Sequence, residues 1–209
     1  MPNEHQVLSD AVRETIALHQ RVLDQQAERI VEAARVVSAS IAAGGKLLIF
    51  GNGGSASDAQ HVAAELVGRY LSERKALAAI ALTTDTSVLT SIGNDYAFDR
   101  IFVRQVEAIG RPRDVALGIS TSGRSPNVVT ALVEAADRGL ATIALTGSDG
   151  GAVGRVAGIH INVPSSSTPR VQEVHRTLLH VICELVEASV LADDSSIDDS
   201  PLAHDGGPA

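Results

Sequence analysis

Apolar residues recur at helical spacing through the first part of the chain. Residues 7–43 contain no Pro or Gly, and the first glycines come directly afterwards, at Gly44 and Gly45. The apolar positions that carry this periodicity are Val12, Ile16, Leu23, Ile30 and Val31. The pattern predicts one long helix over 7–43, broken at most once. A helix of this length exceeds what a simple crossover between strands needs, and such a helix often packs against another subunit.

After Gly45 the pattern changes to short apolar runs that alternate with helical segments. The apolar runs predict strands at 46–50, 78–82, 114–119, 141–146 and 159–163. Helices are predicted at 57–71, 86–92, 97–109, 125–138, 150–157 and 169–192. This alternation is typical of an α/β fold, a three-layer sandwich in which helices cover a five-stranded parallel sheet. Ligands of such sheets bind beyond the carboxyl ends of the strands.

The last residues of the chain differ in composition from everything before them. Residues 193–209 read DDSSIDDSPLAHDGGPA, which is polar, acidic and rich in Gly and Pro. A segment of this composition buries too little apolar surface to offset the entropy lost on folding. We therefore predict a single domain over residues 1–192 and a disordered acidic tail over 193–209.

The composition refines this picture of the domain. Of the 209 residues, 44% are hydrophobic, but only 2% are aromatic and none is Trp. The core must therefore be built from Ala, Val, Leu and Ile, which suits helices packed on a parallel sheet better than a β-sandwich.

Charge and cysteine content limit the classes of partner. The formal net charge is -8, from 17 basic and 25 acidic residues, and five of the acids lie in the tail. The basic footprint of a nucleic-acid-binding protein is absent. Cys183 is the only cysteine, which excludes an internal disulfide and fits a reducing compartment. With no signal peptide or membrane-spanning apolar run in the sequence, we expect a cytoplasmic protein with no nucleic-acid or membrane partner.

The stretch GNGGSASDAQH, residues 51–61, follows the first predicted strand and leads into a helix. Its glycines let the backbone turn tightly and approach a ligand without an intervening side chain. Ser55 and Ser57 are good N-cap residues, and Ser57 with Gln60 has the form of a capping box. Because a helix N-terminus presents free N–H groups and a partial positive charge, this junction suits an anionic or polyhydroxylated ligand.

The same stretch also matches the dinucleotide fingerprint G-x-G-x-x-[GA] over residues 51–56. A dinucleotide site needs an acidic residue near the end of the second strand to hold the ribose. The second strand ends at Thr83-Thr84, and the first acid after it, Asp85, lies too far along the chain. The sequence therefore disfavours a nicotinamide cofactor, and nothing in it requires an organic cofactor.

A second polar loop, STSGRSP, follows the strand predicted at 114–119 and opens the next helix. Ser125 is placed at the N-cap and Pro126 at the first helical position. Four hydroxyls around a glycine at a helix N-terminus favour a phosphate cradle made of neutral donors and backbone N–H groups. The loop lacks the spacing and the lysine of a P-loop.

Two helices carry candidate metal ligands or acid–base groups. His61 and Glu65 lie one turn apart on the helix after the glycine-rich stretch, a spacing that offers two ligands to a metal or a base to a substrate. The last predicted helix carries Gln172, Glu173, His175 and His180. Gln172 and His180 are separated by about 12 Å along a helix axis. They can share one ion only by reaching toward it from opposite directions or if separate subunits contribute, so spacing alone leaves metal binding open.

Five segments in fixed order resemble the phosphoheptose isomerases, the sedoheptulose 7-phosphate isomerases of the sugar-isomerase (SIS) fold. They read GNGGSASDAQHVAAEL, LTTDTSVLTSIGNDYAFDRIF, GISTSGRSPNV, LTGSDGG and VPSSSTPRVQEVHRTLLH. The resemblance covers the chain up to the acidic tail. It implies a flavodoxin-like, five-stranded parallel sheet flanked by helices, a homotetramer, and active sites where subunits meet.

The resemblance also implies roles for individual residues. Glu65 and His180 are the implied acid–base pair, and one zinc ion per subunit is implied at His61, Glu65, Gln172 and His180. The implied substrate contacts are Asn52, Gly53, Gly54, Ser55, Glu65, Asn94, Asp95, Ser120, Thr121, Ser122, Ser125 and Gln172. Taken alone, Asn94 and Asp95 are no more than a loop signal. The loop at 166–170 departs from some family members, which have a tyrosine and an aspartate there, and this departure concerns sugar recognition.

The implied activity is the conversion of sedoheptulose 7-phosphate to D-glycero-D-manno-heptose 7-phosphate, a step of heptose biosynthesis. An aldose–ketose isomerisation moves a proton between C1 and C2 through an enediol and needs an acid–base group on each side of the carbon pair. The alternative is a non-enzymatic tetrameric SIS protein that binds the bacterial replication initiator. Those relatives lack the acid–base pair, so the presence of Glu65 and His180 favours the enzyme.

Overall fold

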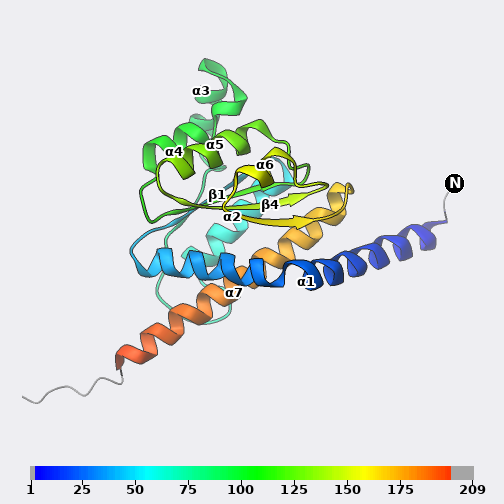
Figure 1. Ribbon diagram of the computed structural model, residues 1–209, viewed down its shortest axis with the longest axis horizontal. Helices are drawn as coiled ribbons and strands as arrows, with labels where there is room; N and C mark the ends of the chain where they lie inside the picture. The colour runs from blue at the N-terminus through cyan, green and yellow to red at the C-terminus, as the bar shows by residue number, and fades with distance from the viewer. Residues whose placement is uncertain (1–2, 199–209) are drawn as a thin grey trace, which may run out of the picture.

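The structure, a computed structural model, describes residues 3–198 and contains one sheet of five parallel strands (Figure 1). The strands are β1 (Leu47–Gly51), β2 (Ala79–Ala81), β3 (Val115–Ser120), β4 (Ala141–Gly147) and β5 (Ile159–Val163), in the order β2-β1-β3-β4-β5. β1 pairs with two neighbours, so that Leu47 lies opposite Ala79 on one side and Val115 on the other. The predicted five-stranded parallel α/β fold is confirmed.

Helices cover both faces of the sheet (Figure 1). One face carries α1 (Glu4–Ala42), α2 (Gly54–Val67) and α7 (Thr168–Asp198). The other carries α4 (Val103–Ile109), α5 (Pro126–Asp137) and α6 (Gly151–Val156), with α3 (Thr86–Asp95) and the 3-10 turn η1 (Phe98–Arg100) beyond them. The three-layer arrangement is therefore also as predicted.

Alternate residues of the central strands β1, β3 and β4 supply two separate cores. Leu47 and Ile49 pack with α1, α2 and α7, whereas Leu48 and Phe50 pack with α4 and α5. All four are buried, which explains why the strands read as continuous apolar runs rather than as alternating patterns. Each such side chain contributes about 1.5–3 kcal/mol of burial free energy, so the two cores fix the sheet between its helical layers.

α1 is one continuous helix of 39 residues, without the single break that the sequence allowed. Its C-terminal half packs on the body of the domain, where Ile30, Ala33 and Val37 are buried. Its N-terminal half projects past the sheet (Figure 1). This half exposes the large apolar side chains Val7, Leu8, Val12, Ile16 and Leu23.

Several helix boundaries differ from the prediction: α1 begins at Glu4 rather than at residue 7, and α3 ends at Asp95 rather than at residue 92. α2 begins at Gly54, three residues before the predicted start, and ends at Val67 rather than at residue 71. The single helix predicted over 97–109 is two elements, η1 and α4. α7 continues through Asp198, whereas the sequence placed its end at residue 192. The first six residues of the predicted tail thus belong to α7, and residues 199–209 lie outside the described part of the chain.

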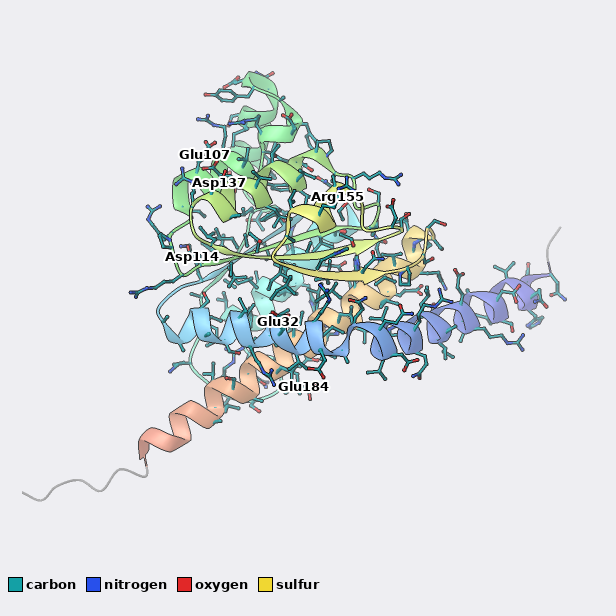
Figure 2. All side chains as sticks on the ribbon, in the orientation of Figure 1. Glu32, Glu107, Asp114, Asp137, Arg155 and Glu184 are labelled. Atoms are coloured by element: carbon teal, nitrogen blue, oxygen red, sulfur yellow. The ribbon has the colours of Figure 1, made fainter. Side chains whose placement is uncertain are left out.

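Charged side chains are spread over both helical layers (Figure 2). Glu107, Asp137 and Arg155 lie on the layer that holds α4, α5 and α6, and Glu32 and Glu184 lie on the opposite layer. Within residues 3–198, no helix combines the length and the apolar character needed to cross a membrane.

Candidate active site

Two loops leave neighbouring strands at the carboxyl edge of the sheet. Gly51, at the end of β1, pairs with Ile119 near the end of β3, so the loops that follow these strands start side by side. The chain leaves β1 for β2 on one side, and β3 lies on the other, which makes this edge the topological switch point of the sheet. The fold therefore brings together the two loops that the sequence identified separately.

The first loop enters α2 through a backbone conformation that needs glycine. Gly53 is the N-cap, with φ 56° and ψ −120°, a combination that is strained for any residue with a side chain. A Cβ on Gly54 would meet the side-chain amide of Gln172, which places the Gln172 amide directly against the start of α2. The first-turn N–H groups of α2 lie beside this loop, as an anionic ligand requires.

The predicted capping box is wrong. Because Gly53 caps α2, Ser55 and Ser57 lie inside the first turn and not before it. Gln60 does not reach back to Ser57; its amide donates to Thr83, after β2, at 3.3 and 3.4 Å. Ser55, which the resemblance implies as a substrate contact, is buried, at 3% exposure.

The hydroxyl loop, residues 120–125, is organised by its own side chains. The hydroxyls of Ser120 and Ser125 lie 2.9 Å apart, and the Arg124 N–H donates to the Ser122 hydroxyl at 3.2 Å. Ser125 is the N-cap of α5 and Pro126 is its first residue, both as predicted. The Ser125 hydroxyl bonds Ser120 and makes no capping bond to α5. Pro126 has no N–H and the Val128 N–H donates to the Ser125 carbonyl at 3.1 Å, so the Asn127 N–H is the first-turn donor left for a ligand.

α6 supports the hydroxyl loop from behind. Gly123 has φ 67°, and a Cβ there would collide with the backbone of Gly150 and Gly151. The Gly123 carbonyl accepts the N–H of Val153 at 2.9 Å. Arg124 pairs with Asp149 at 3.1 Å on the surface, and the hydrogen bond and charge of Arg124 lower the pKa of this carboxyl. The LTGSDGG segment thus holds the loop in place.

Asn127, which the sequence analysis missed, joins the two loops. Its side-chain amide N–H donates to the side-chain oxygen of Asn52 at 2.8 Å, and the side-chain amide N–H of Asn52 donates to the side-chain oxygen of Asn127 at 2.9 Å. Asn127 is buried, at 2% exposure. A hollow of about 260 Å³ beside this pair is lined by Asn52, Phe98, Asp99, Ser125, Pro126 and Asn127. The reciprocal pair fixes the relative position of the two loops.

α2 and α7 lie side by side and bring the second group of candidate residues together. The Nε2 atoms of His61 and His180 are 2.7 Å apart, and the Glu65 carboxylate is 3.5 Å from His61 Nε2. One imidazole must donate an N–H to the other at this distance. The acid–base pair implied by the resemblance therefore meets across the two helices, with His61 between its members.

A second pair that the sequence analysis missed lies one turn before these histidines. The Asp58 carboxylate, at 3% exposure, accepts two N–H groups from Arg176 at 2.6 and 3.1 Å. A hollow of about 450 Å³ lies between Gln172 and Arg176 on α7 and Gly54, Ser57 and Asp58 on α2. Neither Asp58 nor Arg176 carries a local motif, and only the pairing of the helices reveals them.

Gln172 stands apart from the histidine pair within one protomer. It lies against Gly54, two turns before His180 on the same helix. Across the described part of the chain, no group of three or more His, Cys, Asp or Glu side chains has the spacing of a metal site. The described chain thus brings candidate ligands close but does not form a complete set from those residue types.

Asn94 and Asp95 lie on α3, whose Leu89 lines a hollow with Asn52 and Gly53 of the glycine loop. Both are exposed in the last turn of α3, where the Asn94 amide donates to the Asp95 carboxylate at 2.8 Å. α3 stands out from the body of the domain (Figure 1).

His175 has a structural position. It is fully buried and its Nε2 bonds the Thr146 carbonyl oxygen at 3.0 Å, which ties α7 to β4. Burial lowers the pKa of His175 to about 4, against smaller opposing effects of the Thr146 hydrogen bond and the Asp58 charge. This imidazole is therefore neutral at physiological pH.

Comparison with known proteins identifies the family. A SIS domain family model matches residues 12–147. The chain is 54% identical over 178 residues to the phosphoheptose isomerase of Aquifex aeolicus, covering 85% of this chain and 93% of that protein. It is 60% identical over 158 residues to the phosphoheptose isomerase of Citrifermentans bemidjiense, covering 76% and 82%.

Solved structures agree. The phosphoheptose isomerase of Neisseria gonorrhoeae matches with a TM-score of 0.84 at 43% identity, covering 89% of this chain and all (100%) of that chain. The phosphoheptose isomerase of Francisella tularensis matches with a TM-score of 0.85 at 34% identity, covering 88% and 98%. Identities of this size over nearly whole chains, on the same fold, show that the chain belongs to the phosphoheptose isomerase family of SIS-domain proteins.

Proposed function

We propose that this chain converts sedoheptulose 7-phosphate to D-glycero-D-manno-heptose 7-phosphate, with Glu65 and His180 as its acid–base pair. The observation that carries the proposal is the meeting of these two residues, through His61, beside the anion-binding edge of the sheet. α2 connects the two places, because it begins in the glycine loop and carries His61 and Glu65 further along. The family membership supplies the reaction class.

The spacing along α2 fits the substrate. Gly54 and His61 are separated by about 10 Å along the helix axis, which is comparable with an extended seven-carbon sugar phosphate. The phosphate binds at the hydroxyl loop, where Ser120, Thr121, Ser122 and Ser125 and the start of α5 supply neutral donors. Asn52, Gly53, Gly54 and Ser55 contact the sugar from the neighbouring loop. Anchoring the far end in this way positions C1 and C2 at Glu65.

The reaction needs two proton transfers, one between carbons and one between oxygens. Glu65 takes the proton from one carbon and returns it to the other, which forms and then collapses the enediol. His180 moves the proton between the two oxygens. His61 holds the His180 imidazole in place by the hydrogen bond between their Nε2 atoms.

The donor set suits a zinc ion. Two imidazole nitrogens and a carboxylate are ligands that zinc prefers, and His61, Glu65 and His180 present them together. Gln172, by the resemblance, completes the set of one ion per subunit. When bound, zinc would act as a Lewis acid on a substrate oxygen.

A homotetramer would complete the site. The N-terminal half of α1 exposes an apolar stripe, and the groove between α1 and α7 has a volume of about 620 Å³ with mostly apolar walls around Ile16, Leu23, Leu178 and Val181. Patches of this kind mark subunit contacts. Assembly through this surface would let a neighbouring protomer bring further residues to the site.

The test is turnover of sedoheptulose 7-phosphate by the zinc-loaded protein, followed by NMR of the sugar phosphates, with Glu65→Gln and His180→Gln alongside. We expect formation of the heptose aldose, with each variant slower by about 10²–10⁴-fold. Ser87→Ala, an exposed hydroxyl on α3, is the control and should turn over normally. An assembled protein that binds the sugar phosphate without turning it over would contradict the enzyme and favour the initiator-binding alternative.

A further inference from the structure

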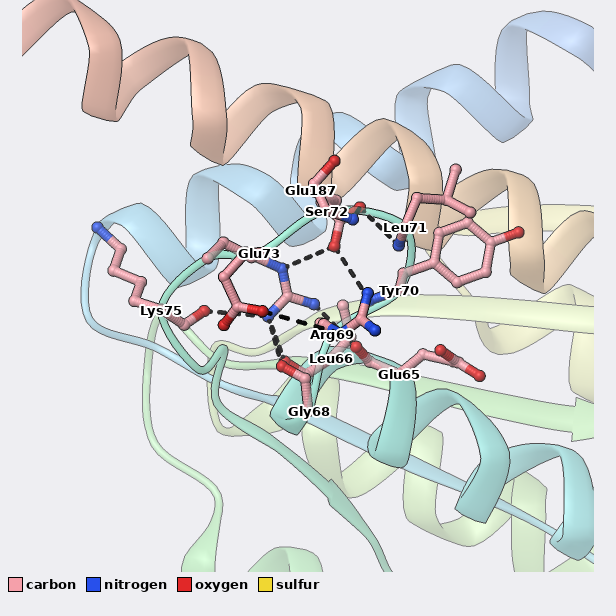
Figure 3. Close-up of polar contacts among 11 residues, drawn as sticks. Glu65, Leu66, Gly68, Arg69, Tyr70, Leu71, Ser72, Glu73, Lys75 and Glu187 are labelled. Atoms are coloured by element: carbon pink, nitrogen blue, oxygen red, sulfur yellow. Dashed lines mark hydrogen bonds and ion pairs between the residues drawn. The ribbon is translucent and has the colours of Figure 1, made fainter.

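A buried carboxylate on α7 holds the segment that follows α2. Glu187 is 3% exposed and accepts the backbone N–H groups of Tyr70, Leu71 and Ser72 at 3.1, 2.9 and 2.9 Å (Figure 3). Three consecutive N–H groups on one carboxylate fix the path of the chain as it leaves α2.

Arg74 completes this arrangement from the same segment. Its side chain is 0% exposed, and its Nε donates to Glu187 at 3.1 Å. The remaining guanidinium N–H groups donate to carbonyl oxygens at the end of α2, namely Glu65 at 2.8 Å, Leu66 at 2.9 Å and Gly68 at 3.2 Å, and to Lys75 at 3.0 Å. A cation on the last carbonyls of a helix satisfies groups that have no partner within the helix. We call Arg74 and Glu187 the clamp.

The clamp is connected to both members of the acid–base pair, directly to the backbone of Glu65 and through Tyr70 to His180. On one side Arg74 binds the backbone carbonyl of Glu65 itself. On the other, Glu187 fixes the backbone of Tyr70, whose ring lies 5.7 Å from the His180 ring, at 30°. His180 in turn contacts His61, with ring centroids 5.0 Å apart. The position of the Glu65 helix turn and the position of the His180 ring therefore depend on one ion pair.

Stability alone does not account for an ion pair at this place. Removing two charges from water is costly, and well-packed apolar residues of similar volume often stabilise a fold as well or better. Charged hydrogen bonds differ from apolar contacts in being directional, so they fix a geometry as well as a contact.

The ionisation of the clamp is consistent with a fixed geometry. Burial would raise the pKa of Glu187, but the N–H groups of Leu71, Ser72 and Tyr70 and the charge of Arg74 outweigh it and lower that pKa. Burial, and after it the carboxylate of Glu184, raises the pKa of Tyr70, so this phenol stays protonated. Neither group changes charge near neutral pH.

We propose that Arg74 and Glu187 are positioning residues for the Glu65/His180 pair and that they act through the end of α2 and through Tyr70. The proposal rests on the proposed function for the roles of Glu65 and His180. It predicts that loosening the clamp lowers kcat and leaves the binding of the phosphate end intact.

The experiment compares Glu187→Gln with the double variant Arg74→Met/Glu187→Leu. Glu187→Gln leaves the Arg74 charge buried without its partner and can unfold the protein, whereas the double variant replaces the ion pair by apolar side chains and should keep the fold. We expect kcat for sedoheptulose 7-phosphate to fall by about 100-fold in each, as for a misplacement of about 1 Å, with KM changed less than about threefold. Tyr70→Phe should retain kcat because the ring remains, whereas Tyr70→Ala should lower it.

A matched control is Asp114→Asn. Asp114 is equally buried and accepts Lys46 Nζ at 2.6 Å and the N–H groups of Lys46 and Arg111, but it lies at the amino end of the sheet. This variant should lose stability without losing kcat. Equal losses of kcat in Asp114→Asn and Glu187→Gln, or a folded double variant with wild-type kcat, would overturn the proposal.

A second readout separates this inference from the proposed function. In the metal-free protein, the imidazole ¹H–¹⁵N signals of His180, assigned with His180→Gln, should move in Glu187→Gln and stay unchanged in Asp114→Asn. If the wild-type protein does not turn over the substrate, the proposed function fails, and these signals still test whether the clamp positions His180. Unchanged His180 signals in Glu187→Gln would refute the proposal that the clamp positions His180, whether or not the protein is an isomerase.

Discussion

The two ends of the proposed site are built in different ways. The phosphate end consists of two short loops. The hydroxyl loop is organised by local hydrogen bonds, such as Ser120 to Ser125 and Arg124 to Ser122, and the Asn52–Asn127 pair joins it to the glycine loop. The reaction end consists of side chains from two helices that are far apart in sequence, His61 and Glu65 on α2 and His180 on α7.

The difference shows how each end achieves rigidity. Backbone N–H groups and short hydroxyl side chains at a strand–helix junction have few rotamers, so the local sequence nearly determines the phosphate end. At the reaction end, long side chains need external support, and the structure supplies it through Asp58–Arg176 and the clamp. Variants at the first end should therefore change binding, and variants at the second should change turnover or the docking of α7.

The largest effect that tests this difference between the two ends is expected at Gly123. The change Gly123→Ala forces a side chain into φ 67° and against the backbone of Gly150 and Gly151. We expect a loss of about 3 kcal/mol in unfolding free energy, from backbone strain and overpacking together, and a large rise in KM. Urea denaturation measures the loss of unfolding free energy, and steady-state kinetics measures the change in KM.

The control is Gly44→Ala, because Gly44 has φ 77° but no atom lies within 4 Å of the place that a Cβ would take. This variant should lose about 1–2 kcal/mol of unfolding free energy, from backbone strain alone, and should keep its KM. Equal effects at the two glycines would mean that α6 does not support the hydroxyl loop.

An intermediate effect is expected from His175, which anchors α7 to β4. Its pKa is lowered to about 4 in the folded protein, below the ordinary value of 6.5. Between these two values the unfolded chain binds a proton that the folded chain does not, so the unfolding free energy falls as the pH drops from 6.5 toward 4. The fall in unfolding free energy attributable to His175 is roughly 3 kcal/mol, and it is complete below pH 4.

This prediction is checked by urea denaturation at pH 7.0 and pH 4.5, at one protein concentration, for the wild type and His175→Gln. The variant should be less stable at pH 7.0 but should lose less stability on acidification. The exposed His5→Gln serves as the control and should follow the wild type. If the unfolding free energies of all three proteins fell equally on acidification, protonation of His175 would not be what destabilises the docking of α7.

The smallest effect is expected at Ser120, which is buried at the phosphate end. Ser120→Ala removes one neutral donor to the phosphate and the partner of Ser125. We expect KM to rise about tenfold, the value of one hydrogen bond to a charged group, with kcat unchanged. Ser38→Ala removes a comparable buried hydroxyl, which bonds the Ala34 carbonyl at 3.0 Å within α1, and should leave KM unchanged. A fall in kcat in Ser120→Ala would show that the two ends are not separable.

The sequence by itself determined the layers, the strands and the phosphate end. Each strand lies within one residue of its predicted bounds. The central strands β1 and β3 are buried on both faces and read as continuous apolar runs, whereas the edge strand β5 alternates apolar and polar residues. Ser125 and Pro126 were placed at the start of α5 because a cap and a proline act through their own backbone. Where a local rule failed, at Ser57, the turn out of β1 requires a positive φ that only Gly53 supplies easily, so the cap moved there.

Only the tertiary structure decided the reaction end. The pairings of His61 with His180, Asp58 with Arg176 and Arg74 with Glu187 join residues that are more than one hundred positions apart. No propensity, cap or periodicity encodes such a pairing, because each depends on the register in which α7 packs along α2. That register is set by the core that α2 and α7 share on one face of the sheet, which includes Val62 and Leu66 of α2 and Leu179 and Ile182 of α7.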